Sequence, residues 1–321
     1  MLRPEYRGPS TLCALRIPAR PAQNPCVASP FLKWAGGKGR LVPVVASAEG
    51  LFESERFIEP FLGGGAMLFG LKARGFQGGA LAADLNGDLV ETFIAVRDAT
   101  EALIEALESL AGEYARLDAA GRARLYYEVR ASRPAGPVER AARLIFLNRT
   151  CYNGLYRVNR AGHFNVPHGS YRNPRICDAD GLRECARDLR GAAIRAADFE
   201  EICGEAGAGD FVYLDPPYQP LSKTASFTSY TDNPFGPAEQ ARLARVVREL
   251  DARGARFVLS NSALPGIAEL YRGFRIVCVD MARNINSIGA RRQPVAEFLI
   301  SNVEVSASGP ERAAEPARSV L

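Results

Sequence analysis

The chain has 321 residues, enough for a large core and roughly two domains, and its 47% hydrophobic and 24% charged residues are typical of a soluble globular protein. A net charge of +4 permits an anionic partner without requiring one. Seven cysteines with no CxxC pair argue against a disulfide framework, and the sequence shows neither a membrane-spanning apolar run nor a secretory core. We therefore expect free thiols and a chain that stays inside the cell.

Both ends of the chain are predicted to be flexible extensions. Residues 1–29 are rich in Pro, Arg and Ala, and residues 304–321 are rich in Ala, Ser, Glu and Arg. Such compositions bury little apolar surface. We expect the folded part of the chain to begin near residue 30 and to end near residue 303.

A glycine-rich stretch, FLKWAGGKGRLVP, opens the folded part at residues 31–43. It is not a P-loop, because Leu32 stands where Walker A needs glycine and Gly39 stands where it needs Ser or Thr. What remains is Lys38 on a glycine loop beside Trp34, the only tryptophan. A lone lysine of this kind is more often simply solvated.

Short apolar runs separated by helical patterns follow along the chain. The predicted strands are 56–61, 79–84, 192–198, 210–215, 255–261, 274–280 and 295–301. The clearest helix covers 237–254, where apolar residues share one face before a terminal glycine. This alternation predicts an α/β fold with a parallel, doubly wound sheet.

The first strand ends in a glycine turn, IEPFLGGGAMLFGL, at residues 58–71. Three glycines before a helix let the backbone approach a ligand where helix N–H groups are unpaired. Counting from Gly63, Leu68 replaces the last glycine of the dinucleotide fingerprint, so a nucleotide-like cofactor without a pyrophosphate fits better. Asp84 ends the next strand about twenty residues on, where such folds bind ribose hydroxyls. A turn that serves packing alone is the plain alternative.

Between residues 91 and 175 the pattern is helical and contains no strand. One long amphipathic helix is predicted over 91–112, with further helices over 121–130 and 137–150. The insertion ends in a polar segment, residues 147–174, in which arginines alternate with aromatic residues: Arg149, Arg157, Arg160 and Arg172 with Tyr152, Tyr156, Phe164 and Tyr171. Arginines suit phosphates and guanine edges, and aromatic rings can wedge between bases or stack on them. A solvated hairpin is the plain alternative.

The strand at 210–215 ends in Asp215, Pro216, Pro217 and Tyr218. Two prolines make a stiff, extended exit in which backbone carbonyls remain acceptors. Asp215 and the Pro216 carbonyl can then face one donor group, while Tyr218 offers a stacking surface. This arrangement indicates a pocket for a planar ring that carries an amino group, although an ordinary turn has the same residue types.

Taken in order, FLKWAGGK, EPFLGGG, DLN and DPPY resemble the Dam-like (D12 class, alpha group) family of DNA adenine-N6 methyltransferases over about residues 30–302. The resemblance implies a Rossmann-like sheet that binds S-adenosyl-L-methionine, with catalytic domain 30–90 and 176–303 and a helical target-recognition insertion, 91–175. It also implies catalytic residues at Asp215, Pro216, Pro217 and Tyr218. The cofactor residues that it implies are Trp34, Lys38, Glu59, Pro60, Phe61, Gly63, Gly65, Asp84, Asp198, Phe199 and Asp215.

The polar segment resembles the DNA-reading hairpin of the same family. By that likeness Tyr152 fills the stack left by the target base, and Leu155, Arg157 and Pro167 contact the recognition sequence, expected to be GATC. The remaining residues assigned to DNA are Lys33, Arg149, Asn153, Asn165 and Tyr171. Ser170 departs from the family, which often has a basic residue there.

The implied reaction is methylation of an adenine N6 amine that has left the duplex. Asp215 and the Pro216 carbonyl would bind the N6 hydrogens and stabilise the developing positive charge, and Tyr218 would stack on the flipped ring. No metal is implied. Duplex DNA is the expected partner of a monomer at the nucleoid in the cytoplasm, with a cognate restriction endonuclease as a candidate second partner.

Other functions stay open on sequence grounds. A catalytically silent DNA-binding module and an adenine-N6 methyltransferase acting on RNA are the two main alternatives. Cytosine C5 methylation is disfavoured because the only Pro-Cys pair, Pro25-Cys26, lies in the N-terminal extension. Cytosine N4 enzymes more often carry Ser at position 215, and the glycine spacing disfavours an NAD-dependent oxidoreductase.

Overall fold

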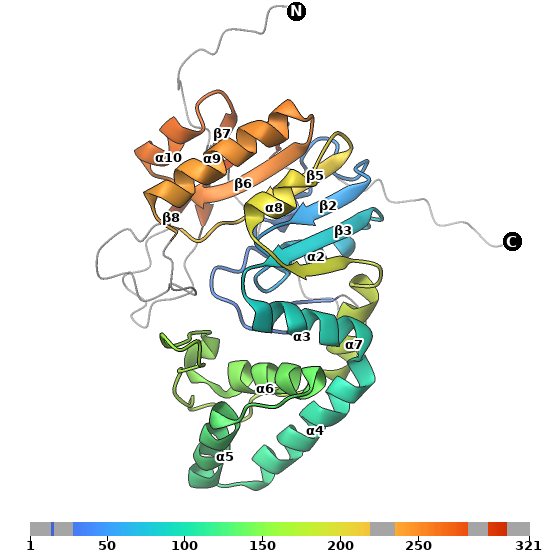
Figure 1. Ribbon diagram of the computed structural model, residues 1–321, viewed down its shortest axis with the longest axis vertical. Coiled ribbons are helices and arrows are strands. Elements are labelled where there is room, and N and C mark those ends of the chain that lie inside the picture. The colour runs from blue at the N-terminus through green and yellow to red at the C-terminus, as the bar shows by residue number, and fades with distance from the viewer. Residues whose placement is uncertain (1–13, 16–27, 219–234, 282–294, 307–321) are drawn as a thin grey trace, which may run out of the picture.

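The computed structural model describes residues 14–15, 28–218, 235–281 and 295–306. In this part of the chain a twisted sheet is covered by helices, and a separate group of helices extends from one end (Figure 1). None of the described helices is both long and apolar enough to span a bilayer.

Among the described residues, eight strands form one sheet in the order β1-β7-β8-β6-β5-β2-β3-β4. Their bounds are β1 (Ala14–Leu15), β2 (Arg56–Glu59), β3 (Gly79–Asp84), β4 (Ala193–Ala196), β5 (Asp210–Leu214), β6 (Arg256–Ser262), β7 (Arg275–Met281) and β8 (Val295–Ser301). All seven predicted strands are therefore present, and the two-residue β1 adds to them by pairing with β7.

The prediction of a wholly parallel sheet is wrong for the last strand. β8 runs antiparallel to both of its neighbours, β6 and β7, whereas the other pairings are parallel. β8 lies between two strands and is buried on both faces, so its sequence is mostly apolar, as that of a parallel strand would also be. Its direction could not be read from the residues.

Helices cover both faces of the sheet because successive strand residues point to opposite sides. Phe57 of β2 packs with α1 (Val42–Val45), α2 (Ala66–Lys72) and α7 (Ala179–Asp188), whereas Ile58 packs with the opposite layer. That layer contains α8 (Phe199–Gly204), α9 (Pro237–Ala252) and α10 (Pro265–Leu270). The result is the three-layer arrangement of a Rossmann-like methyltransferase fold.

The helices between β3 and β4 are α3 (Gly87–Asp98), α4 (Thr100–Arg116), α5 (Ala119–Ala131) and α6 (Pro137–Thr150). The single long helix predicted over 91–112 is two helices, since Ala99 leaves helical geometry at φ −136°. Arg97 donates to the carbonyl of Ala192 and thereby ties the end of α3 to the start of β4. Because α3 packs against β4 as well as α6, the domain boundary at residue 91 stays a prediction.

Parts of both predicted flexible ends pack against the folded chain. The Cys185 thiol donates to the carbonyl of Ser29 at 3.2 Å, and Ala28 is buried. At the other end, Glu49 N–H donates to the carbonyl of Glu304 at 3.0 Å, and Ser47 Oγ donates to the Ser306 carbonyl. Ala14–Leu15 of the N-terminal extension also pair with β7, so the prediction of flexibility is wrong for these parts. Residues 1–13, 16–27 and 307–321 lie outside the described residues.

Candidate active site

Four acidic residues predicted to act in the site stand where parallel strands end. Glu59 is the last residue of β2 and Asp84 the last of β3, while Asp198 and Asp215 follow β4 and β5. The carboxyl ends of parallel strands meet at one edge of a sheet, which is the usual ligand edge of such folds. Because β8 is antiparallel, its early residue Glu297 reaches the same edge, opposite Ser262 of β6.

Lys38 lies at the centre of a buried ionic cluster at this edge. Its Nζ donates to the Tyr218 hydroxyl at 2.6 Å and to Glu297 Oε2 and Oε1 at 3.0 and 3.2 Å, and lies 3.5 Å from Asp215 Oδ1. The Tyr218 hydroxyl donates to Glu297 Oε2 at 3.0 Å. Burial favours the neutral amine, but Asp215 and Glu297 outweigh it and raise the pKa of Lys38. Through the charged ammonium of Lys38, the glycine loop near the N-terminus therefore contacts Asp215 and Tyr218 of the DPPY segment.

Asp215 is held from the neighbouring strand. Ser260 Oγ of β6 donates to Asp215 Oδ1 at 2.7 Å and lies 3.3 Å from the Tyr213 hydroxyl. Burial raises the pKa of Asp215, against the opposing effect of Lys38. With its side chain 21% exposed, the carboxylate still has access to the edge. The arrangement presents a fixed acceptor next to the ring of Tyr218.

The glycine turn after β2 is shaped by two neighbours. Gly63 N–H donates to Asp84 Oδ2 at 3.0 Å, and Asn86 N–H donates to Asp84 Oδ1 at 3.0 Å. Gly63 has φ +49°, and a Cβ there would lie 3.0 Å from the Trp34 ring. Burial raises the pKa of Asp84, although these backbone N–H groups oppose the shift. Asp84 thus holds the turn while standing at the predicted ribose position.

Glu59 is buried, and its Oε2 has no hydrogen-bond partner among the described residues. Burial raises the pKa of Glu59 well above its ordinary value, and nearby Asp215 adds to the shift. A buried carboxyl oxygen without a partner is costly, so its retention at the ligand edge needs a reason. A cationic or amino group of a ligand would satisfy it.

Asp198 and Phe199 form the far side of the same edge. Asp198 caps α8 by accepting from Glu200 N–H at 2.9 Å, and it also pairs with Arg242. Phe199 stacks on Phe61 with ring centroids 5.3 Å apart, and the Arg242 guanidinium lies 4.2 Å from the Phe199 ring centroid. The structure therefore brings two predicted cofactor residues, Phe61 after β2 and Phe199 after β4, into ring contact.

The polar segment forms the predicted hairpin. Isolated bridges pair Cys151 with His168 and Val158 with Phe164, and a short 3₁₀ turn covers Tyr152–Gly154. The Tyr152 side chain is 53% exposed. In that turn Asn153 adopts the left-handed conformation, at φ 55°.

Other predicted DNA residues meet within this hairpin. Arg157 donates to Asn165 Oδ1 at 2.6 Å across it, and Tyr152 N–H donates to the Pro167 carbonyl at 2.9 Å. Leu155 is partly buried, whereas Arg157 and Pro167 are exposed.

The loop around Lys33 is joined to the end of α6. Asn148 accepts from Lys33 N–H and donates to the Lys33 carbonyl, both at 2.8 Å. The Lys33 ammonium lies 3.9 Å from the Tyr171 ring centroid, which brings two predicted DNA residues together. Arg149 instead turns inward and donates to the Phe31 carbonyl at 2.7 Å. Its predicted role toward DNA stays a prediction.

Three residues at these sites were missed by the sequence analysis. Ser260, Glu297 and Asn148 are each 9% exposed or less, and each has a hydrogen bond to a predicted site residue far along the chain. A signal existed for Glu297, because a lone acid inside the apolar run VAEFLIS requires a buried partner. Ser260 and Asn148 carry no comparable signal, since small polar residues are common near strand and helix ends.

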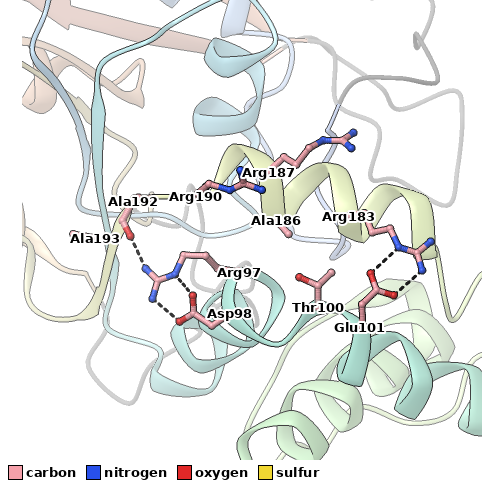
Figure 2. A pocket seen from close by; sticks show the side chains of 11 residues that line it. Arg97, Asp98, Thr100, Glu101, Arg183, Ala186, Arg187, Arg190, Ala192 and Ala193 are labelled. Carbon is pink, nitrogen blue, oxygen red and sulfur yellow. Dashed lines mark hydrogen bonds and ion pairs between the residues drawn. The ribbon is translucent and has the colours of Figure 1, made fainter.

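Two surface pockets lie away from the strand ends. Figure 2 shows the first, of about 600 Å³, where Arg97 pairs with Asp98 and Arg183 with Glu101. It adjoins Ala193, the first residue of β4, and so lies at the opposite edge of the sheet from the acids. The second, of about 640 Å³, is bordered by Tyr152, Tyr171 and Arg172 of the hairpin. Only the second adjoins residues predicted to act.

The fold and the site define a Rossmann-like methyltransferase with a helical insertion, and comparison with known proteins gives its family. The family of D12 class N6 adenine-specific DNA methyltransferases matches residues 34–285. The chain belongs to this family and is an adenine-specific DNA methyltransferase. Of the functions left open by the sequence, this assignment favours an enzyme over a silent binding module and DNA over RNA.

Similar proteins span almost the whole folded chain. The type II methyltransferase M.MjaIII of Methanocaldococcus jannaschii is 43% identical over 85% of this chain and 98% of its own length. The type II methyltransferase M1.LlaDCHI of Lactococcus lactis subsp. cremoris is 37% identical over 85% and 95%. The DNA adenine methylase of Escherichia coli K12 is 33% identical over 84% and 93%.

Proposed function

We propose that this enzyme transfers a methyl group from S-adenosyl-L-methionine to the N6 amine of an adenine flipped out of duplex DNA, within the sequence GATC. The observation that carries the proposal is the position of Asp215. Its Oδ1 accepts from Ser260 and lies 3.5 Å from the Lys38 ammonium, whereas Oδ2 has no hydrogen bond or ion pair with the described residues. Since the Asp215 side chain is 21% exposed, we infer that this oxygen can accept from a donor that binds at the edge.

The chemistry of an exocyclic amine explains the arrangement. The lone pair on N6 is conjugated with the adenine ring and is a poor nucleophile until the nitrogen becomes tetrahedral. Asp215 and the Pro216 carbonyl would hold the two N6 hydrogens, favour that geometry and stabilise the positive charge on nitrogen. Asp215 would accept the proton that the nitrogen loses after the new N–C bond forms. Tyr218 would stack on the base.

The residues at the edge fit S-adenosyl-L-methionine, which supplies a methyl group already activated on a sulfonium. Glu59 Oε2, which has no hydrogen-bond partner among the described residues, suits the amino group of the methionine end. Asp84 would accept from the ribose hydroxyls, and Asp198 with the Phe61 and Phe199 rings would bind the adenine; the position of these residues at the same sheet edge supports this assignment. We assign Trp34 and Lys38 to the boundary between cofactor and target base, since Lys38 contacts both Asp215 and Tyr218.

The hairpin supports duplex DNA as the substrate. An exposed Tyr152 beside the left-handed Asn153 is suited to enter the space left by a flipped base. Arg157, braced by Asn165, can present its guanidinium to a guanine edge. The name of one relative, DNA adenine methylase, agrees with this substrate. We infer that a monomer acts on nucleoid DNA, and the type II relatives make a cognate restriction endonuclease a partner to test.

The deciding experiment compares Asp215→Ala with wild type in single-turnover transfer of labelled methyl groups to GATC duplexes. Removal of one preorganised partner of a developing charge commonly slows a reaction by about a hundred- to a thousandfold. Cofactor and duplex affinities, measured by titration, should be nearly unchanged. If Asp215→Ala transferred methyl groups at close to the wild-type rate, the DPPY segment would be structural and the proposal would fail.

A further inference from the structure

Glu297 has no assigned role, yet it is the common partner of two site residues. Its Oε2 accepts from both Lys38 Nζ and the Tyr218 hydroxyl, each at 3.0 Å, and its side chain is only 11% exposed. A charge so deeply buried is costly unless it is paired and fully hydrogen-bonded. Glu297 comes from β8, which is separated from the catalytic β5 by β6.

Lys38 stands between two carboxylates, and its distances to them differ. Nζ is 3.0 Å from Glu297 Oε2 but 3.5 Å from Asp215 Oδ1, so its contacts with Glu297 and Tyr218 are the shorter ones. If Glu297 were neutral, the ammonium would have Asp215 as its only strong anionic partner among the described residues. A carboxylate fully paired with an ammonium is a weaker acceptor for a second donor.

We propose that Glu297 is a positioning residue for methyl transfer, which retains the Lys38 ammonium so that Asp215 remains available to the target amine and Tyr218 remains oriented for stacking. The inference rests on the proposed role of Asp215. It deepens that role by adding a residue that touches neither the amine nor the methyl group. It also explains why an acid is kept inside an otherwise apolar strand.

The groups around Asp215 determine how the reaction rate depends on pH. Three charged or acidic groups surround Asp215: Lys38 on the glycine loop, Glu297 on β8 and Glu59 on β2. The Tyr213 hydroxyl reaches Asp215 indirectly, through the Ser260 hydroxyl. Burial raises the pKa of Asp215 most, Lys38 lowers it and Glu297 raises it. Since the ionised Asp215 is the acceptor, the rate should fall as pH drops through this raised pKa. Removing the negative charge of Glu297 lowers the pKa of Asp215. The fall in rate on the acid side of the pH–rate profile, here called the acid limb, should therefore occur at lower pH.

The test measures single-turnover methyl transfer by Glu297→Gln, with saturating S-adenosyl-L-methionine and GATC duplex, across the acid range. The plateau rate should fall about ten- to a hundredfold, the usual effect of losing a charged hydrogen-bond partner. The acid limb should shift to lower pH at the same time, and KM for both substrates should change little. A merely structural role would not produce a slower enzyme that tolerates more acid.

Two further variants keep the test decisive. Glu297→Asp keeps the negative charge but places it farther from Lys38. Its plateau rate of methyl transfer should therefore be lower than that of wild type, while its acid limb should lie at the same pH. Ser301→Ala, at the far end of β8, removes a buried hydroxyl that donates to the Val303 carbonyl and should leave rate and limb unchanged. The inference would be overturned if either Glu297 variant had the wild-type plateau rate, including the case in which only KM is raised. A wild-type enzyme unable to methylate adenine with this cofactor would instead refute the proposed function.

Discussion

Asn148 closes a two-bond ring on the backbone of Lys33, accepting from its N–H and donating to its carbonyl at 2.8 Å each. A third bond, to the Gly154 carbonyl at 3.2 Å, connects the same side chain to the start of the hairpin. One buried amide therefore joins the N-terminal loop, α6 and the hairpin. The loop continues from Lys33 to Lys38, so the parts of the chain that we propose to face DNA and to act in catalysis share this support.

Asn148→Ala should destabilise the protein, because it leaves the partly buried N–H and carbonyl of Lys33 without their partners. The expected loss is about 1–3 kcal/mol in the free energy of unfolding, measured by urea denaturation. Asn159→Ala is the matched control, since Asn159 is exposed and bonds only within the tip of the hairpin. If both substitutions changed the free energy of unfolding by the same amount, the hydrogen bonds of Asn148 would not contribute specially to joining the loop, α6 and the hairpin.

Asp84→Ala should weaken S-adenosyl-L-methionine binding by about ten- to a hundredfold, because it removes a charged acceptor for the ribose hydroxyls. The variant also frees Gly63 N–H, so the glycine turn should loosen. Isothermal titration measures the affinity. Asp88→Ala, which removes an exposed acid from the first turn of α3, should bind as wild type does. Unchanged affinity in a folded Asp84 variant would place the ribose elsewhere.

Arg157→Ala should relax base discrimination, since a side chain that reads one base typically contributes about 1–3 kcal/mol against the wrong one. Methylation rates on GATC and on its single-base variants measure the effect. Arg160→Ala, in the exposed tip of the same hairpin, should slow methylation of every duplex by a similar factor. If Arg157→Ala did the same, Arg157 would hold phosphate rather than a base.

Tyr218→Ala should reduce methyl transfer strongly by removing the stacking ring, whereas Tyr218→Phe should lose much less. The hydroxyl is nevertheless engaged by Lys38 and Glu297, so the Phe variant should be measurably slower than wild type. Single-turnover transfer separates these effects from product release. A Phe variant as slow as the Ala variant would mean that the hydroxyl matters more than the ring.

Local patterns were sufficient to predict the strands and the order of the motifs. Seven apolar runs became β2 to β8 because burial on a sheet needs little more than length and hydrophobicity. The direction of β8 and the break at Ala99 were not predictable, because both depend on which surfaces the segments meet. The same limit applies to the site. The strand-end positions of Asp215 and Asp84 were predictable from the sequence, whereas Ser260 and Asn148 are brought to the candidate site by hydrogen bonds to residues more than forty positions away.

The two charged residues Lys38 and Glu297 are 259 positions apart in the sequence. During synthesis the glycine loop, the turn after β2 and the DPPY segment all emerge before the strand that carries Glu297. Until β8 joins, the edge of β6 has no antiparallel neighbour and the Lys38 ammonium has only Asp215 as an anionic partner among the described residues. An unfinished or truncated chain would therefore hold its acceptor in an internal ion pair, and the capacity to modify DNA would arise only when the last strand closes the sheet.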